Sequence, residues 1–421
     1  LPDAWELAYG YDPLIADNTS LDVDGDGSSL LDEFNQDSFP ELADEPRIFE
    51  TTTFRRPNSS IDQAADGFGL ALTHGDFDND GLADVVMGSP ADGSGKVYIY
   101  YGGSGTEAAL QELAPVDSAH TSFDAQLATG DLNGNGLPDL IVHSTGGAYV
   151  YYNNGALLDT PDSIVNVSGG NPTVTIAVGD LDGDNLEDVV VSYDAGGSNR
   201  RAINMYLSAN DTDVPAGENP RALDADSVQV RDSGVYYRHD SEILDIDGDG
   251  LNDLVFAANQ SGAERVDFYF GSVFDWNNPG AFVPTRVLPG PPGQGRFGWR
   301  MAGGFDLGTD GITDLVVGSI GAEGTNEPGW VNVYNSEDNY WTGSLAQRMP
   351  AQIIQGRAGF IGGNDARADA FGASVALGQL DLDGHADLVV GASRAGAQDT
   401  GEVHVYRGTG SFAGNEPFAV A

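Results

Sequence analysis

The stretch G-D-F-D-N-D-G-L-A-D-V-V-M-G-S-P, residues 75–90, decides the fold class because it joins an acidic loop directly to an apolar run. The loop holds Asp76, Asp78, Asp80 and Asp84, four carboxylates within nine residues. Like charges at this spacing repel one another unless a positive charge lies between them. The stretch therefore predicts a turn organised around a cation, followed at once by a buried strand.

This acidic loop recurs, and six copies are found along the chain. The first positions of successive copies lie 49–73 residues apart, which is long enough for one four-stranded propeller blade per repeat. The later copies are D-L-N-G-N-G-L-P-D from Asp131, D-L-D-G-D-N-L-E-D from Asp180, D-I-D-G-D-G-L-N-D from Asp245, D-L-G-T-D-G-I-T-D from Asp306 and Q-L-D-L-D-G-H-A-D from Gln379.

Two runs of strand-forming residues follow every loop. The first is apolar, rich in β-branched residues and too short for a helix, as in residues 84–90 and 253–259. The second alternates with a period of two and is aromatic, as in residues 96–102 and 402–408. A Phe-Gly pair and a run of small residues precede several loops, at residues 68–69, 297–298 and 371–372. Small side chains suit strands crowded around a central axis, so the pattern predicts an all-β propeller.

Four features recur in a fixed order: Phe-Gly, D-x-D-x-D-G-x-x-D, an apolar strand and a strand of the G-x-V-Y-x-Y kind. This order resembles the FG-GAP repeats of the integrin α-subunit β-propeller and its bacterial relatives. The resemblance covers residues 46–421 and implies that this region is one propeller domain. The best-known members of the family have seven blades, whereas this chain has six copies of the loop. The integrin ligand-binding surface is therefore not transferred to this chain.

Closure of a six-bladed ring needs an outer strand for the last blade. The 30 residues of 46–75 and the 42 residues that follow Gln379 together make about one further repeat. The segment R-I-F-E-T-T, Arg47–Thr52, is expected to supply this outer strand. The apolar tail at 417–421 would then be spare and available for β-augmentation of a second copy, or would fold back locally.

Calcium is the cation that these loops fit best, because it takes six to eight oxygen ligands, whereas an all-protein cage seldom meets the octahedral geometry of magnesium. The first, third, fifth and ninth side chains and the seventh carbonyl would converge on the ion, with a left-handed residue at the sixth position. The ligands so predicted in the first four copies are Asp76, Asp78, Asp80, Leu82 and Asp84; Asp131, Asn133, Asn135, Leu137 and Asp139; Asp180, Asp182, Asp184, Leu186 and Asp188; and Asp245, Asp247, Asp249, Leu251 and Asp253.

The last two copies are weaker, because Gly308 removes one ligand and Gln379 replaces another. Their predicted ligands are Asp306, Asp310, Ile312 and Asp314, and Gln379, Asp381, Asp383, His385 and Asp387. The alternative for all six copies is that the acidic residues only make Asx hydrogen bonds and stay solvated.

A separate acidic segment, D-V-D-G-D-G-S-S-L-L-D-E, matches the EF-hand loop template and resembles thrombospondin type 3-like or dockerin-like loops. Its predicted ligands are Asp22, Asp24, Asp26, Ser28 and Glu33. Residues 1–45 are expected to form a small helical calcium-loop module, with a solvated acidic linker as the alternative. The whole chain is predicted to bind several calcium ions, about four to seven.

The composition of the chain limits the classes of partner that it can bind. The formal net charge of −47 would repel nucleic acids and anionic membranes, and no apolar run is long enough to cross a bilayer. The chain has no cysteine, which excludes disulfides and thiol chemistry. It begins with Leu1 rather than methionine, so a processed or fragmentary chain is expected. Numerous weak calcium sites suit the millimolar calcium outside cells, which favours an extracellular or cell-surface location.

Two function classes remain. The first is a calcium-stabilised adhesion, interaction or structural protein that binds a protein or glycan surface or copies of itself, including as a fibre. The second is an enzyme, or an accessory domain of a polysaccharide- or ester-degrading hydrolase or lyase, with a site in the central channel. The six histidines are scattered and match no zinc motif, which favours the first class. A channel lined by histidine, arginine and paired carboxylates would favour the second. The strand tyrosines are expected to pack in the core.

Overall fold

The computed structural model describes the part of the chain that carries the six repeats. All of these residues belong to one compact unit, Arg56–Gly378 with His385–Ala421. The residues described are 71–89, 94–102, 110–117, 123, 126–144, 147–155, 159–166, 175–194, 200–208, 230–233, 235–260, 263–273, 276, 283–307, 311–321, 327–335, 341, 349–356, 370–378, 385–393, 402–408 and 419–420. The expected module at 1–45 lies outside them.

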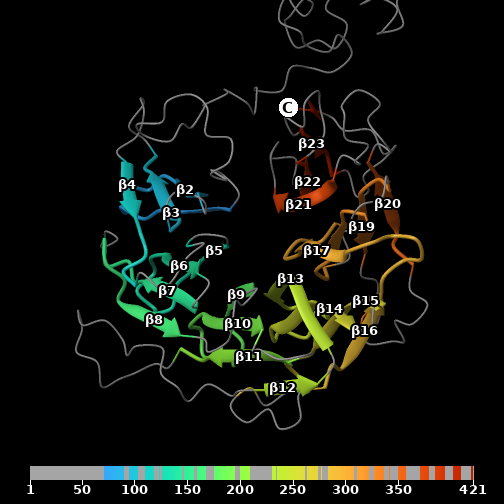
Figure 1. Ribbon diagram of the computed structural model, residues 1–421, viewed down its shortest axis with the longest axis horizontal. Helices are drawn as coiled ribbons and strands as arrows, with labels where there is room; N and C mark the ends of the chain where they lie inside the picture. The colour runs from blue at the N-terminus through green and yellow to red at the C-terminus, as the bar shows by residue number, and fades with distance from the viewer. Residues whose placement is uncertain are drawn as a thin grey trace, which may run out of the picture. The chain divides into compact units, whose positions relative to one another are not determined.

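Six four-stranded antiparallel sheets make up this part of the chain, which confirms the predicted six-bladed all-β propeller (Figure 1). No helix occurs among the described residues. Sheets 1 and 2 consist of β1 (Leu72–Gly75), β2 (Asp84–Ser89), β3 (Lys96–Tyr100) and β4 (Leu110–Leu113), and of β5 (Leu127–Gly130), β6 (Asp139–Ser144), β7 (Gly147–Tyr151) and β8 (Ser163–Asn166). Sheets 3 and 4 consist of β9 (Thr175–Gly179), β10 (Asp188–Asp194), β11 (Arg200–Tyr206) and β12 (Val230–Ser233), and of β13 (Val235–Leu244), β14 (Asp253–Gln260), β15 (Ala263–Tyr269) and β16 (Arg286–Pro289). Sheets 5 and 6 consist of β17 (Phe297–Ala302), β18 (Leu315–Ser319), β19 (Trp330–Tyr334) and β20 (Gln352–Gln355), and of β21 (Phe371–Gly378), β22 (Asp387–Ala392), β23 (Glu402–Tyr406) and β24 (Ala419–Val420).

Each sheet is a meander whose strands pair in chain order. The acidic loop connects the first strand to the second, so that Gly75 pairs with Asp84 and Gly130 pairs with Asp139 across the two ends of a loop. The apolar run is the second strand and the aromatic run is the third, as predicted. The first strands of successive sheets contact one another in the order β1, β5, β9, β13, β17 and β21. This arrangement places the acidic loops of sheets 1 to 4, whose residues are all described, at equivalent positions.

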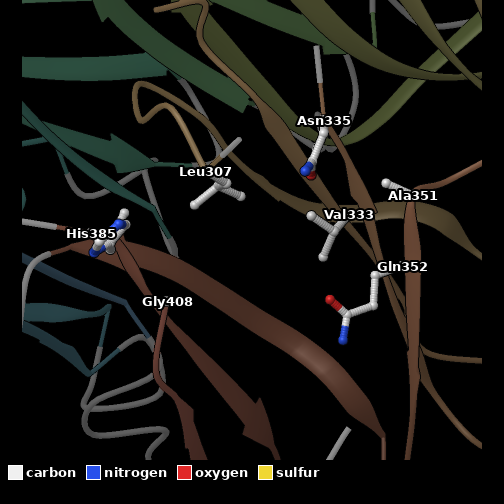
Figure 2. A pocket seen from close by; sticks show the side chains of 8 residues that line it. Leu307, Val333, Asn335, Ala351, Gln352, His385 and Gly408 are labelled. Carbon is white, nitrogen blue, oxygen red and sulfur yellow. The ribbon is translucent and has the colours of Figure 1, made fainter. Parts of the chain in front are cut away.

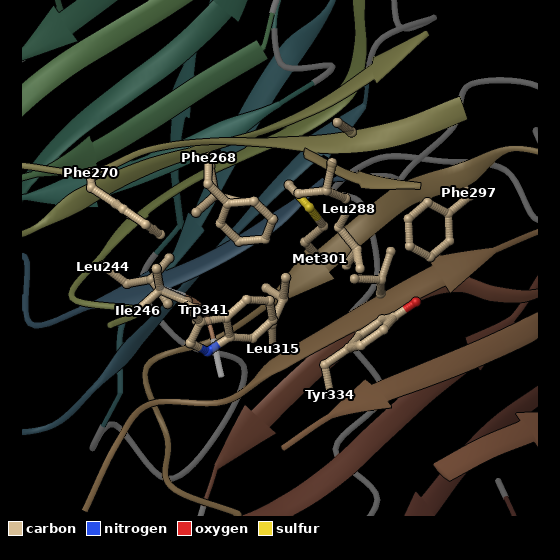
Figure 3. Close-up of a cluster of buried hydrophobic side chains, with 14 residues drawn as sticks. Leu244, Ile246, Phe268, Phe270, Leu288, Phe297, Met301, Leu315, Tyr334 and Trp341 are labelled. Atoms are coloured by element: carbon tan, nitrogen blue, oxygen red, sulfur yellow. The ribbon is translucent and has the colours of Figure 1, made fainter. Parts of the chain in front are cut away.

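Buried side chains fill the spaces between adjacent sheets, from sheet 1 to sheet 6. Between sheets 4 and 5, the ring centroids of Phe268 and Trp341 lie 5.0 Å apart, and Tyr334 lies 6.5 Å from Trp341 (Figure 3). Each fully buried ring of this size stabilises the fold by about 1.5–3 kcal/mol. All eight tyrosines of the third strands are buried, as expected: Tyr98, Tyr100, Tyr149, Tyr151, Tyr206, Tyr269, Tyr334 and Tyr406.

The Phe-Gly pair opens the first strand of sheets 5 and 6 through a backbone turn that only glycine fits. Gly298 and Gly372 have φ angles of +84° and +81°. A Cβ on Gly298 would lie 2.7 Å from the Cβ of Ala257, and a Cβ on Gly372 would lie 2.8 Å from the carbonyl oxygen of Trp330. The preceding phenylalanine is buried in both sheets. The motif therefore joins a core side chain to a close approach of two backbones.

The predicted closing strand is wrong. The position beside β23 is occupied by the C-terminal β24, through the pairs His404 with Val420 and Val405 with Ala419. Arg47–Thr52 was assigned to this position and lies outside the described residues. Only twelve residues separate β23 from β24, so a local pairing costs less loop-closure entropy than pairing with a segment some 350 residues earlier. Of the two alternatives for the tail, a spare strand and local folding back, the pairing of Ala419 and Val420 with β23 agrees with the second.

Candidate metal centres

The six acidic loops are numbered loop 1 to loop 6 in chain order, and the nine residues of each loop are numbered by position. Position 1 closes the turn by accepting backbone hydrogen bonds. In loop 1, Asp76 Oδ1 accepts from Asp80 N at 3.1 Å and Asp76 Oδ2 accepts from Gly81 N at 2.9 Å. The equivalent bonds in loops 2, 3 and 4 measure 2.7–3.2 Å. The carboxylate at position 1 therefore stabilises the turn of each of these loops through backbone hydrogen bonds.

Position 6 takes the left-handed conformation that the sequence predicts. Gly81, Gly136, Gly250 and Gly311 have φ angles of +82° to +89°, and Asn185 has a φ angle of +69°. Asparagine tolerates this region better than other residues with a side chain. Asn185 therefore replaces glycine in loop 3 without loss of the turn.

Position 5 makes a local Asx hydrogen bond to the backbone N–H of position 7. Asp80 Oδ1 accepts from Leu82 N at 2.8 Å, and Asp249 Oδ1 accepts from Leu251 N at 2.9 Å. The alternative without a cation predicted bonds of this kind. Because each bond uses one carboxylate oxygen, the second oxygen remains suitable as a metal ligand.

Position 9 ties each loop to the third strand of its own sheet. In loop 1, Asp84 Oδ2 accepts from Phe77 N at 2.7 Å and Asp84 Oδ1 accepts from Gly102 N at 2.8 Å. Loops 2, 3 and 4 repeat this pair of bonds at 2.6–3.0 Å. The sequence predicted position 9 as a ligand and missed this structural role. Its place as the first residue of a buried strand was the available signal.

Burial changes the acidity of position 9. It raises the pKa of Asp84 and raises the pKa values of Asp139, Asp188 and Asp253 to about 7. Loss of hydration is the largest cause, and it outweighs the two backbone N–H groups, which lower the pKa. A nearby cation would favour the ionised form of these groups.

Three of the loops bring carboxylate oxygens together as a divalent cation requires. In each of them, one oxygen from each of three aspartates lies within 4.8 Å of the other two. The three groups are Asp76, Asp78 and Asp84 in loop 1, Asp180, Asp182 and Asp184 in loop 3, and Asp245, Asp247 and Asp253 in loop 4.

Loop 4 supplies a further test of the fit. Asp247 Oδ1 is buried and accepts no hydrogen bond of ordinary geometry from the described residues, although the backbone N–H of Asp249 lies close enough to the carboxyl group to lower its pKa. Burial raises the pKa of Asp247, and the neighbouring charges of Asp249 and Asp245 raise it further. A buried carboxylate oxygen that lacks a full hydrogen-bond partner is unfavourable unless a cation compensates it. The residues of loop 4 therefore fit a hard divalent cation.

Loop 2 has the same turn with different side-chain chemistry. Asn135 Oδ1 accepts from Leu137 N at 2.8 Å, as the aspartates do at position 5 of other loops. Asn135 Nδ2, however, donates to the carbonyl oxygen of Asn153 at 2.7 Å. The amide therefore places a donor where an aspartate would have its second oxygen. Asn133 and Asn135 remain predicted ligands, at a loop with less negative charge than loop 4.

The other predicted ligands are described only in part. In loop 5, Asp306 Oδ2 accepts from Gly311 N at 2.6 Å and Asp314 Oδ2 accepts from Leu307 N at 2.6 Å. In loop 6, Asp387 Oδ1 accepts from Gly408 N at 3.0 Å. The predicted ligands that lie outside the described residues are Asp22, Asp24, Asp26, Ser28, Glu33, Asp310, Gln379, Asp381 and Asp383.

A small cavity of about 70 Å³ lies between sheets 5 and 6 beside His385, at position 7 of loop 6 (Figure 2). Asn335 and Gln352 contribute its other polar side chains, and Leu307 and Val333 contribute apolar surface (Figure 2). Its volume suits one or two water molecules rather than an organic ligand.

The repeats match known families. A model described as FG-GAP-like repeat matches residues 76–142 and 131–191, and the FG-GAP repeat model matches residues 371–406. These are FG-GAP repeats. Integrin alpha pat-2 of Caenorhabditis briggsae is 32% identical over 170 residues, which are 37% of this chain and 13% of that protein. Integrin alpha-E of Homo sapiens is 32% identical over 170 residues, 38% of this chain and 13% of that protein. The fold is thus an integrin alpha-like FG-GAP propeller.

Other relatives of the FG-GAP region differ in kind. The phosphatidylinositol-glycan-specific phospholipase D of Dictyostelium discoideum is 25% identical over 193 residues, 41% of this chain and 19% of that protein. The solved Dos1 propeller has a TM-score of 0.39 at 11% identity and covers 84% of this chain and 72% of that chain, a likeness too distant to bear on function. This chain covers only 13% of the length of the two integrins.

The first strands of the FG-GAP sheets also carry a charged group that the sequence did not single out. Asp240 and Glu242 lie on β13, and Arg300 lies on the neighbouring β17. Asp240 is buried, and its Oδ2 accepts a hydrogen bond from Met301 N at 2.7 Å. Loss of hydration raises the pKa of Asp240 and, with the charge of Asp240, raises the pKa of Glu242, while Arg300 lowers both. Paired carboxylates beside an arginine are part of what the enzyme alternative requires.

Proposed function

We propose that this chain is an extracellular interaction propeller whose FG-GAP loops bind calcium, and that calcium stabilises the fold instead of acting as a transient signal. The observation that carries the proposal is Asp247 Oδ1, a buried oxygen within a group of three carboxylates. A calcium ion at loop 4 would be held by Asp245, Asp247 and Asp253, with Asp249 and the Leu251 carbonyl as further oxygen ligands. Loops 1 and 3 would bind calcium through equivalent positions.

Calcium fits these loops better than magnesium does. Each complete loop offers four carboxylates and a carbonyl from one short segment, while two of the carboxylates are already held by backbone hydrogen bonds. A ligand set fixed in this way suits the variable coordination of calcium, whereas magnesium demands near-ideal octahedral geometry and keeps several waters.

The interaction role is supported by the integrin alpha relatives and by charge. Two of the three protein relatives named above for the repeat region are integrin alpha chains. The net charge of −47 opposes binding to nucleic acids, which leaves proteins, glycans or copies of this chain as partners. The described residues include no helix with the length and hydropathy needed to span a bilayer.

Binding of the purified chain to immobilised extracellular-matrix proteins and glycans, in calcium and in chelator, tests this function. We expect saturable binding to at least one surface in calcium and its loss in chelator. Light scattering at high concentration tests self-association in the same buffers. Absence of binding to every surface by a monomeric, calcium-loaded chain would contradict the interaction role.

An enzyme is the second candidate, because Asp240, Glu242 and Arg300 bring paired carboxylates and a guanidinium together on neighbouring first strands. One carboxylate that stays protonated beside one that ionises could serve acid–base hydrolysis or elimination. Assays of polysaccharide and phosphodiester cleavage with the wild-type chain and with Glu242→Gln test it. Equal activity of the two proteins would exclude this site.

A further inference from the structure

In loops 2 and 3, the backbone of the position-1 residue is hydrogen-bonded to a residue of the next sheet. In loop 3, the carbonyl oxygen of Asp180 accepts a hydrogen bond from Asn252 Nδ2, a position-8 side chain of loop 4, at 2.8 Å. In loop 2, the carbonyl oxygen of Asp131 accepts from Glu187 N, at position 8 of loop 3, at 3.2 Å. Glu187 Oε2 also accepts from Asp131 N at 2.6 Å. In these two pairs of loops, position 8 of one loop therefore contacts the first residue of the preceding loop.

Asn252 is attached to a fixed part of loop 4. It directly precedes Asp253, whose two oxygens accept hydrogen bonds from Ile246 N at 3.0 Å and Gly271 N at 2.8 Å. Asp253 also belongs to the carboxylate group of loop 4. A cation that fixes Asp253 therefore fixes the backbone from which Asn252 reaches loop 3.

At the other end of this contact, Asp180 organises loop 3. Its Oδ1 accepts from Gly183 N at 2.8 Å and from Asp184 N at 3.2 Å, and its Oδ2 accepts from Asn185 N at 2.9 Å. Asp180 is also a member of the carboxylate group of loop 3. Restraint of the Asp180 backbone therefore restrains a predicted ligand and the turn that it folds.

We propose that Asn252 couples the cation sites of loops 3 and 4, so that calcium bound in one loop strengthens calcium binding in the other. The proposal rests on the proposed calcium binding and adds a positioning residue to it. Linkage makes the effect reciprocal: occupancy of loop 3 favours loop 4 by the same factor. One hydrogen bond of ordinary strength corresponds to an affinity change of about threefold to tenfold.

Position 8 does not need an amide for the fold. Loops 1 and 6 have alanine at this position, Ala83 and Ala386, and the structure describes the same second strand directly after each of them. The Asn252→Ala variant is therefore expected to fold. Thr313→Ala is the matched control, because Thr313 occupies position 8 of loop 5 and lies on the other side of loop 4.

A calcium titration followed by backbone amide NMR separates the two loops. The amide of Gly183 donates to Asp180 in loop 3, and the amide of Gly250 donates to Asp245 in loop 4, so each reports on its own site. In the wild type we expect the two resonances to respond over one calcium range. In Asn252→Ala we expect the midpoint for Gly183 to move to about threefold to tenfold higher calcium, and in Thr313→Ala to stay unchanged.

A double-mutant cycle completes the test. Asp247→Asn, which weakens loop 4, should weaken the response of Gly183 when Asn252 is present and should have no such effect in Asn252→Ala. Independent responses in the wild type, or the same midpoint for Gly183 in Asn252→Ala, would overturn the coupling and leave calcium binding intact. If neither amide responds to calcium, the proposed function itself fails.

Discussion

Loops 2 and 4 have the same backbone hydrogen bonds and differ in the partners of their side chains. In both, position 1 accepts from positions 5 and 6, and position 9 accepts from the loop and from the end of the third strand. In loop 2, Asn135 satisfies itself by donating to the carbonyl of Asn153. In loop 4, the buried oxygen Asp247 Oδ1, at position 3, accepts no hydrogen bond of ordinary geometry from the described residues. Positions 1, 6 and 9 thus determine the turn, and we expect positions 3 and 5 to determine how strongly it binds a cation.

Calcium removal should have the largest effect on this comparison. Each site at a calcium concentration 100 times its dissociation constant contributes about 2.7 kcal/mol, so loops 1, 3 and 4 together would contribute about 8 kcal/mol. Thermal unfolding in excess calcium and in excess chelator measures the difference. Coincident unfolding curves would show that calcium does not stabilise the acidic loops.

The pH dependence in chelator should be the next largest effect. Burial raises the folded-state pKa values of Asp139, Asp188 and Asp253 to about 7, above the ordinary value of 3.8. The folded chain therefore binds more protons than the unfolded chain between these values, and its stability falls as pH rises from 4 to 7. We expect a loss of about 2 kcal/mol per carboxylate between pH 5 and pH 8.

Calcium should remove most of this pH dependence, because an ion in loops 3 and 4 would compensate the ionised Asp188 and Asp253, whereas we expect weaker binding beside Asp139 in loop 2. Denaturant unfolding at pH 5 and pH 8, with and without calcium, gives the four free energies required. A stability that rises with pH in chelator would contradict the raised pKa values of Asp139, Asp188 and Asp253.

Loss of the position-9 contact should come third. Asp139→Ala leaves the backbone N–H groups of Leu132 and Asn153 without their acceptor, at a cost of about 3 kcal/mol. The cost should differ little between calcium and chelator, because we expect loop 2, with amides at positions 3 and 5, to bind calcium more weakly than loop 4. Asp253→Ala is the matched variant in loop 4 and should cost more in calcium. A calcium-dependent cost for Asp139→Ala would show that loop 2 also binds an ion.

The sequence predicted the propeller well because its pattern is local. The turn of loop 1, the buried strand after Asp84 and the buried tyrosines follow from residue type and period, and the structure confirms them. Long-range pairing was not predictable in the same way. The choice between Arg47–Thr52 and Ala419–Val420 beside β23 depends on loop-closure entropy, which favours the nearer segment and which the prediction from repeat length did not weigh.

The finer chemistry of the loops also depends on contacts between distant residues. Asn135 and an aspartate are equivalent in a ligand template, and only the carbonyl of Asn153, 18 residues away, distinguishes them. Asn252 and Glu187 occupy an unspecified position of the motif, and their roles appear only when adjacent sheets are seen together. The pair Asp240 and Glu242 was missed because Arg300 lies on another sheet.

Asp247→Asn should have a smaller effect with opposite signs in the two conditions. In calcium, loss of a ligand should remove up to one site, about 2–3 kcal/mol. In chelator, replacement of this partly buried carboxylate by a neutral amide should leave stability unchanged or raise it by about 1 kcal/mol. Asn133→Ala at the same position of loop 2 is the control and should show no calcium dependence. Equal losses for Asp247→Asn in both conditions would mean that loop 4 binds no ion.

The smallest expected effect comes from making loop 2 resemble loop 4. In the double variant Asn133→Asp and Asn135→Asp, the donor to the Asn153 carbonyl is replaced by a carboxylate oxygen, so the free energy of unfolding in chelator should fall by about 1–2 kcal/mol. Saturating calcium should restore it, and isothermal titration calorimetry should show one additional calcium per chain. An unchanged calcium number would mean that positions 3 and 5 are not what separates the two loops, whereas an additional ion would show that two amides keep loop 2 independent of calcium.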